Sequence, residues 1–555
     1  MKKILIPIFT VALLFGTSCK KQFFDINNSP NSPTEASITP KVLLPRILHT
    51  LGLRVGNGFD YSALWMGYWS RSGSFGQSIE PESYNITTTY QAAQWTNWYD
   101  LLTDVNLMEK QAVALKLPFY VGVAKTIKAM GFMYLVDQYN NVPYSKAFDF
   151  TNSVSPAYDK GEDIYADLFV QLEAGAKAFK DADAAATAAG GVDAETQGAD
   201  IMFGTLGYNK GVSEITLWRK LLNTQRLKLL IHESQVVNPT TVTTVTGQIT
   251  ADGSGFLGAG QNALVNPGYV VVDTKQNPFW NSYKVSALGV LDTYNRANIY
   301  ILTKYAGPDN KLAANNLTTT AGQALAATQA VDDDIRYQFV FSKAATPMTG
   351  STPYQGALTG APIYNYIGTN WGEVVPNSDP YRAVNQSDVA GPGLAKAPTQ
   401  SQAVLTATES LFLQAEAAQR GWITADPATL YKTAVEQSFV YLTATANGLS
   451  ATATADAYLA GPNPTANYVA ATDKIKFLVM AKYLSLIGLD NFEAYVDYRR
   501  LGVPTDLPLS LNANRLTNVI PLRLQYPKAE YDVNTAAVGA QGTINPQTST
   551  IFWDK

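Results

Sequence analysis

The chain has 555 residues, of which 46% are hydrophobic and 15% are charged, so it can form a large core and is not globally disordered. Length alone permits about two to four domains or one large repeat structure. The formal net charge of -4 argues against a nucleic-acid partner, because phosphate backbones are bound by basic proteins.

The first residues have the pattern of a bacterial lipoprotein leader. Lys2 and Lys3 precede a short apolar run over residues 4–15, and small residues then lead to Cys19, the single cysteine of the chain. The apolar run is too short to span a bilayer, so the pattern predicts a cleaved signal peptide over residues 1–18. Cys19 is then the expected lipidation site. The alternative is an ordinary signal peptide with an incidental cysteine.

The segment behind the leader predicts a tether followed by one folded body. Residues 19–40 are rich in Asn, Ser, Pro and Thr, which is typical of an extended linker. We expect residues 41–555 to form a single domain without a further membrane-spanning segment.

Helical periodicity begins in the first half of this body. Residues 120–139 are apolar on nearly every side and predict a buried helix. Asp159 and Glu162 form a predicted capping pair for an amphipathic helix that follows. Residues 218–231 predict another amphipathic helix.

The second half repeats the helical pattern. Thr406 and Glu409 predict a capping box, and Asp426 predicts the start of the next helix. Residues 477–487 carry a third apolar stripe, which Gly488 ends. Helix pairs with small residues at the crossing and aromatic residues on the second helix resemble tetratricopeptide repeats.

Four long segments between these helices lack periodicity and predict loops. They are residues 181–200, 237–265, 311–330 and 442–472, all rich in Ala, Thr, Gly and Asp. Long loops on a rigid scaffold often carry binding sites, although each can equally be an exposed insertion without a role.

Aromatic residues supply the candidate binding site. Flat rings stack on sugar faces or pack against peptide side chains, and neighbouring Asn and Ser groups supply hydrogen bonds. We select Trp65, Trp69, Tyr364, Tyr366 and Trp371 as candidate ligand-binding residues. The last three lie off any helical stripe and predict a shallow stacking platform. The alternative for all five is packing of the ring in the core.

The sequence does not contain the common catalytic and metal-binding patterns. With His49 and His232 as the two histidines, no histidine-based metal spacing is possible, and Cys19 is assigned to lipid. We therefore expect no catalytic residues, no metal and no cofactor, although 45 acidic residues leave a two-carboxylate glycosidase open. Arg499 and Arg500 either clamp a carboxylate ligand or bind acids and carbonyls within the fold.

Seven segments, spread in order over nearly the whole chain, carry a family resemblance. They are residues 24–27, 31–34, 64–69, 137–144, 409–417, 497–504 and 520–527. Together, behind a lipoprotein leader, they resemble the SusD/RagB-like outer-membrane nutrient-binding lipoproteins, specifically the second SusD-like branch.

This resemblance implies a mainly α fold, a SusD-like superhelix of tetratricopeptide-like helix pairs with long irregular loops. It implies a lipid-anchored protein in the outer membrane that faces the cell exterior. The implied partner is a SusC-like TonB-dependent barrel, over which the lipoprotein acts as a lid that captures an oligosaccharide or a peptide. The alternative is a structural SusD-like subunit of a larger outer-membrane assembly without a nutrient ligand.

Overall fold

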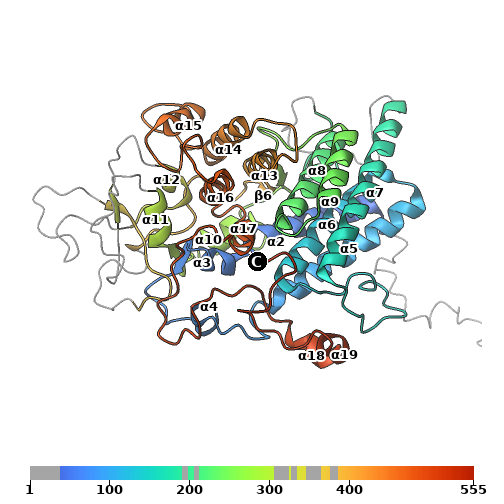
Figure 1. The fold of residues 1–555 in the computed structure, drawn as a ribbon, viewed down its shortest axis with the longest axis horizontal. Helices are drawn as coiled ribbons and strands as arrows, with labels where there is room; N and C mark the ends of the chain where they lie inside the picture. The colour runs from blue at the N-terminus through green and yellow to red at the C-terminus, as the bar shows by residue number, and fades with distance from the viewer. Residues whose placement is uncertain are drawn as a thin grey trace, which may run out of the picture.

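The computed structural model describes residues 38–189, 198–204, 212–305, 324–326, 334–345, 364–374 and 385–554. Cys19, the predicted signal peptide and most of the predicted tether lie outside these residues. Helices dominate the described chain and its strands are short, which confirms the predicted mainly α fold (Figure 1).

The first half of the chain forms a layered array of helices. The α5 helix packs on α6, α6 on α7, α7 on α8 and α8 on α9, so the array grows in chain order (Figure 1, right). The helices of this half are α2 (Pro40–Asn57), α3 (Asp60–Trp65), α4 (Ile79–Ser83), α5 (Ala92–Leu115), α6 (Pro118–Tyr139), α7 (Gly161–Ala188), α8 (Glu214–His232) and α9 (Pro239–Asp252).

The α6 helix lies at the centre of this array and is buried on nearly every side. Glycines permit the close approach, because a Cβ at Gly122 would lie 2.7 Å from the Phe179 ring of α7 and one at Gly131 would lie 2.8 Å from Leu102 of α5. By length and hydropathy this helix could also cross a membrane, which our expectation from the sequence overlooked, but 83% of its apolar window is buried inside the protein.

The second half forms another group of helices that packs against the first. The α13 helix contacts α14 and α16 and also reaches α8, so it joins the two halves (Figure 1). The helices are α10 (Pro278–Tyr283), α11 (Ile299–Tyr305), α12 (Tyr337–Val340), α13 (Ala407–Gln419), α14 (Pro427–Leu442), α15 (Ala451–Ala460), α16 (Lys474–Ser485), α17 (Asn491–Leu501), α18 (Lys528–Val533) and α19 (Thr535–Gly539).

Short antiparallel strand pairs hold the irregular segments together. The β1 strand pairs with β3, β2 with β6, and β4 with β5. Their bounds are β1 (Trp69–Arg71), β2 (Ala263–Val265), β3 (Asn295–Ala297), β4 (Ala324–Ala326), β5 (Tyr364–Ile367) and β6 (Gln402–Leu405).

Two predicted helix starts are confirmed and one is wrong. The Thr406 hydroxyl accepts from the Glu409 N–H at 3.2 Å, and the Asp426 carboxylate accepts from the Thr429 N–H at 2.9 Å. Asp159 does not cap α7, whose preceding residue makes no side-chain cap. Its carboxylate instead accepts from the backbone N–H groups of Tyr144 and Ser145, because the chain turns back past it.

Helices occupy parts of three predicted loops. The α9 helix lies within residues 237–265 and α15 lies within 442–472, while α7 continues to Ala188. Asn238 and Ser450 cap the first two, a signal that the Thr- and Ala-rich composition concealed. Most of the predicted loop 311–330 lies outside the described residues.

Candidate functional site

The predicted ligand-binding residues Trp65 and Trp69 lie in the core. Trp65 packs against Tyr61 with ring centroids 5.1 Å apart, and its indole N–H donates to the Pro81 carbonyl at 3.3 Å. Trp69 is 0% exposed and meets Tyr283 edge-to-face at 4.8 Å. The structure therefore contradicts the expectation that these two rings offer a stacking surface.

The predicted platform at residues 364–371 is also buried where the structure describes its side chains. Tyr366 contacts Tyr337 edge-to-face at 4.8 Å, and Trp371 is 2% exposed. Gly368 belongs to this packing, because a Cβ there would lie 2.9 Å from the backbone nitrogen of Ile299. The glycine marks close packing and not an exposed loop, so the platform expectation is wrong for Tyr366 and Trp371. The side chain of Tyr364 lies outside the described residues.

A different surface lies at one end of the β1–β3 pair. Because the strands are antiparallel, the segment after β1 and the segment before β3 leave the pair at the same end. The Ser72 N–H donates to the Tyr294 carbonyl at 2.7 Å, and the Phe75 ring meets the Tyr294 ring edge-to-face at 5.2 Å. Phe75 is 41% exposed, so a ligand can reach this aromatic pair.

Two further segments complete this surface. The Gln77 amide donates to the Gly372 carbonyl at 2.6 Å, and the Leu511 N–H donates to the Trp371 carbonyl at 2.9 Å. We define residues 72–80, 286–294, 371–374 and 510–516 as the loop surface. Its exposed apolar side chains are Phe75, Ile79, Leu288, Val290, Leu291, Val374, Leu511 and Leu516. Trp371 belongs to one of these segments but its ring is buried, and Trp69, on the β1 strand that leads into the first segment, is buried as well.

A buried ion pair fixes the loop surface to the scaffold. Arg71 Nε lies 2.7 Å from Glu82 Oε1, and both side chains are almost completely buried. Burial raises the pKa of Glu82, and Arg71 opposes that shift. The Arg71 guanidinium also donates to the carbonyls of Phe75 and Glu373, so one side chain holds two segments of the surface.

The sequence alone did not predict that Phe75 and Tyr294 take part in a candidate binding surface. The signal for Phe75 is a large ring between Ser74 and Gly76, in a segment without helical neighbours. Tyr294 had no signal of its own, because its place beside Phe75 follows from strand pairing over more than 200 residues of sequence.

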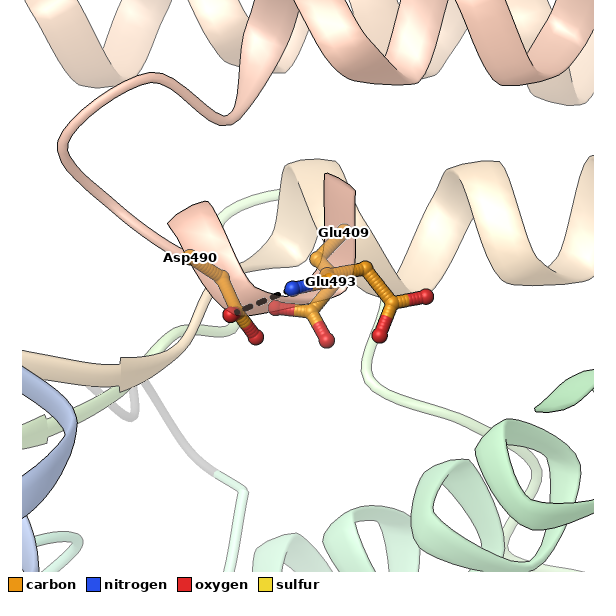
Figure 2. Close-up of side chains that lie close together, drawn as sticks. All are labelled: Glu409, Asp490 and Glu493. Carbon is orange, nitrogen blue, oxygen red and sulfur yellow. Dashed lines mark hydrogen bonds between the residues drawn. The ribbon is translucent and has the colours of Figure 1, made fainter. Parts of the chain in front are cut away.

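Three buried carboxylates form a second cluster of chemical interest. Glu409 comes from α13, and Asp490 and Glu493 come from the start of α17 (Figure 2). Their oxygens are close enough to hold a metal ion. However, the ammonium of Lys228 lies 2.7 Å from Glu409 and 3.0 Å from each of the other two, so a lysine occupies the position that a cation would take.

His232 extends this cluster. Its Nδ1 lies 2.9 Å from Asp137 and its Nε2 lies 3.0 Å from Glu493. Burial lowers the pKa of His232, but Glu493 and Asp137 together raise it above the usual value. All these groups are buried and bind one another, so the cluster stabilises the joint between the two halves and is not accessible to a ligand.

A cavity of about 710 Å³ lies over α6 between α5 and α7. Lys125 and Lys128 line it, and both ammonium groups bind the Glu109 carboxylate, at 2.9 and 2.5 Å. Asp167 accepts from the Tyr144 hydroxyl on the other side. Because these groups satisfy one another, the cavity defines no ligand class.

Comparison with known families gives one match over most of the chain. A sequence model of the SusD-like family described as starch-binding and associating with the outer membrane matches residues 30–527. No curated protein matches the chain.

Several solved structures share the fold. A SusD homologue from Bacteroides fragilis is 20% identical, with a TM-score of 0.68, and the match covers 93% of this chain and 100% of that one. A chitin-binding SusD homologue from Flavobacterium johnsoniae is 18% identical, with a TM-score of 0.67, over 93% and 98% of the two chains. A protein described as chitin-binding is 23% identical, with a TM-score of 0.65, over 93% and 100%. Because the family model covers nearly all of the folded body and these structures share its helical superhelix, the chain belongs to the SusD-like family.

Proposed function

We propose that this protein captures a nutrient at the outer membrane and acts as the lid of a SusC-like TonB-dependent barrel. The observation that carries the proposal is the loop surface, where an accessible aromatic pair and exposed apolar side chains stand on a buried scaffold. Such a surface can bind a ligand and a partner, whereas the buried carboxylates cannot reach a substrate. We therefore propose a binding role without catalysis.

We propose a glycan as the first ligand class to test, with a peptide as the alternative. The description of the family names starch, and two similar structures are described as chitin-binding. Maltoheptaose, chitohexaose and an extended peptide library are suitable probes for calorimetry and affinity capture. Hydrolysis of any of these probes by the purified protein would contradict the binding role.

Purification from detergent-solubilised outer membranes tests the partner. Recovery of one SusC-like barrel supports the importer. Recovery of barrel-assembly components without such a barrel supports the second candidate, a structural subunit without a nutrient ligand.

Replacing Phe75 by Ala should weaken binding of the preferred probe about twofold to tenfold, because an aromatic contact contributes about 0.5–1.5 kcal/mol beyond its buried area. Stability should change little, since the ring is 41% exposed. Calorimetric titration together with thermal melting checks both expectations.

Ile79→Ala serves as the matched control for Phe75→Ala, because it removes an exposed apolar side chain of the same surface without removing a ring. Equal loss of affinity in both variants would show that the Phe75 ring has no specific role.

Replacing Cys19 by Ala should release the protein from the membrane fraction or leave its leader uncleaved. We propose that Cys19 carries the lipid anchor, because several acyl chains on one residue give stable membrane attachment. Fractionation and metabolic lipid labelling measure the effect. Retention and labelling equal to those of the wild type would refute the anchor.

A further inference from the structure

A groove of about 630 Å³ lies between the two halves of the scaffold, away from every residue of the loop surface. The turn after α8 and the first turns of α9 form one wall, and the turn between α13 and α14 forms the other. Its lining includes Ser234, Val237, Val242, Thr243, Arg420 and Trp422. This volume is within the range of small-molecule sites, which is about 300–1,000 Å³.

Arg420 is the charged side chain of the described lining. Its Nε and Nη2 both donate to one oxygen of Glu416, at 3.0 and 2.8 Å. Arg500 binds the same carboxylate through both oxygens at 2.6 Å, and it is completely buried. Two guanidinium groups therefore share one carboxylate, and the bidentate pair with Arg500 has the stronger geometry. Arg500 also binds the Asp497 carboxylate, at 2.7 and 2.9 Å, so Glu416 is not its only counter-charge. Arg420 donates to Glu416 through Nε and Nη2, and among the described residues its Nη1 has no hydrogen-bond partner, so Nη1 can bind an oxyanion in the groove.

The groups around Arg420 are held in place. The guanidinium lies 5.4 Å from the centroid of the Trp422 ring, and the backbone N–H of Trp422 donates to the Ala417 carbonyl at 2.9 Å. The Ser234 hydroxyl accepts from Arg500 at 3.2 Å, so its own proton can be donated to another oxygen. The Thr243 hydroxyl donates to the Pro239 carbonyl and keeps acceptor capacity on the groove side.

We propose that this groove binds an acidic saccharide, a uronic acid unit whose carboxylate pairs with Arg420. The sugar hydroxyls meet the hydroxyls of Ser234 and Thr243, and its apolar edge meets Trp422. The carboxylate follows from Arg420, because guanidinium recognises planar oxyanions in a fork geometry. The choice of a saccharide rests on the proposed function. The groove is a second site, separate from the loop surface.

Digalacturonate and the neutral disaccharide galactobiose are the probes. Calorimetry on the wild-type protein should give at least about tenfold tighter binding of digalacturonate, because a hydrogen bond to a charged group contributes more than a neutral one. The preference should decrease with rising salt, since the charge is partly exposed. Equal affinity for the two disaccharides, or no binding of digalacturonate, would overturn the proposal.

Arg420→Gln should abolish the preference for digalacturonate. Lys177→Gln is its control, because it changes the net charge equally at an exposed position on α7, outside the groove lining. Binding of digalacturonate by Arg420→Gln as tight as by the wild type would refute the assignment.

A second pair of variants avoids the contact between Arg420 and Glu416, in case Arg420→Gln fails to fold. Thr243 is exposed on the opposite wall, so Thr243→Glu adds a negative charge without disturbing buried groups. It should weaken binding of digalacturonate at least about tenfold relative to Thr243→Gln, whereas the two variants should bind galactobiose with equal affinity, because both lack the Thr243 hydroxyl. Equal binding of digalacturonate by both Thr243 variants would overturn the proposal.

Two further measurements separate this site from the loop surface. Phe75→Ala should leave digalacturonate binding unchanged, and Thr243→Glu should leave maltoheptaose or chitohexaose binding unchanged. Tight binding of the acidic peptide acetyl-Glu-Glu-amide without binding of digalacturonate would show a carboxylate site for peptides and reject the saccharide. If Phe75→Ala loses binding of maltoheptaose or chitohexaose and keeps binding of digalacturonate, the result concerns the proposed function of the loop surface. It leaves the groove proposal unaffected.

Discussion

Replacing Lys228 by Met is expected to lower the free energy of unfolding by about 3–5 kcal/mol, because removing one partner of a buried ion pair leaves uncompensated charge. Here three carboxylates, those of Glu409, Asp490 and Glu493, share the lysine ammonium at 2.7 to 3.0 Å. Urea unfolding at pH 8, followed by circular dichroism, measures the loss. Lys476→Met is the control, because it removes an exposed lysine from α16 and should change stability by less than about 0.5 kcal/mol.

The loss of unfolding free energy in Lys228→Met should also depend on pH, because the carboxylates around Lys228 change their protonation with pH. Burial raises the pKa of Glu409 to about 7 even with Lys228 beside it. Removing the ammonium raises that pKa further. An acid whose pKa is raised in the folded state adds stability below its unfolded value and loses that stability as pH rises through its folded value. The deficit of Lys228→Met should therefore be smaller at pH 5 than at pH 8. The same deficit at both values would show that the carboxylates are not responsible.

Replacing Trp371 by Ala is expected to cost about 3–5 kcal/mol of stability, as truncation of a buried tryptophan does in other cores. The ring is 2% exposed, and the loop that carries it also anchors Gln77 and Leu511 of the loop surface. We expect ligand binding to weaken as well, because the segments that the ring supports shift when it is removed. Urea unfolding and calorimetry together measure the two effects.

Two variants distinguish a core role of Trp371 from a direct contact with ligand. Trp371→Phe keeps most of the buried apolar area and should cost less than about 1.5 kcal/mol while preserving binding. Phe75→Ala should instead weaken ligand binding with little loss of stability. If Trp371→Ala unfolds like the wild type but fails to bind the glycan, the ring contacts the ligand and the buried position described here is wrong for the bound state.

The helical scaffold could be predicted from the sequence because its signals are local. Residues 120–139 repeat apolar side chains over many turns, and the caps at Thr406 and Asp426 lie within three residues of their partners. The α9 helix was not predicted because its threonines interrupt the periodic pattern of apolar residues, although Asn238 caps its start. Asp159 shows the converse, since an acid with cap-like spacing binds a distant turn instead.

The candidate site could not be predicted from the same signals. Whether an aromatic ring is buried depends on partners far away in sequence, as with Trp69 and Tyr283 or Tyr366 and Tyr337. Glycines near Trp371 suggested an exposed loop, whereas Gly368 permits close packing on Ile299. Composition pointed to segments within or next to the proposed loop surface, but it could not tell the exposed Phe75 from the buried Trp69 and Trp371.

The buried cluster around Lys228 and His232 also sets an order of events during synthesis. Both cations lie on α8, and their partners Asp490 and Glu493 follow 262 and 261 residues later in the chain. A ribosome adds about 5–20 residues each second, so the two groups remain without these partners for many seconds. The first helical array therefore cannot close its interface with α17 until nearly the whole polypeptide has been made. For a protein associated with the outer membrane this delay favours export before folding is complete.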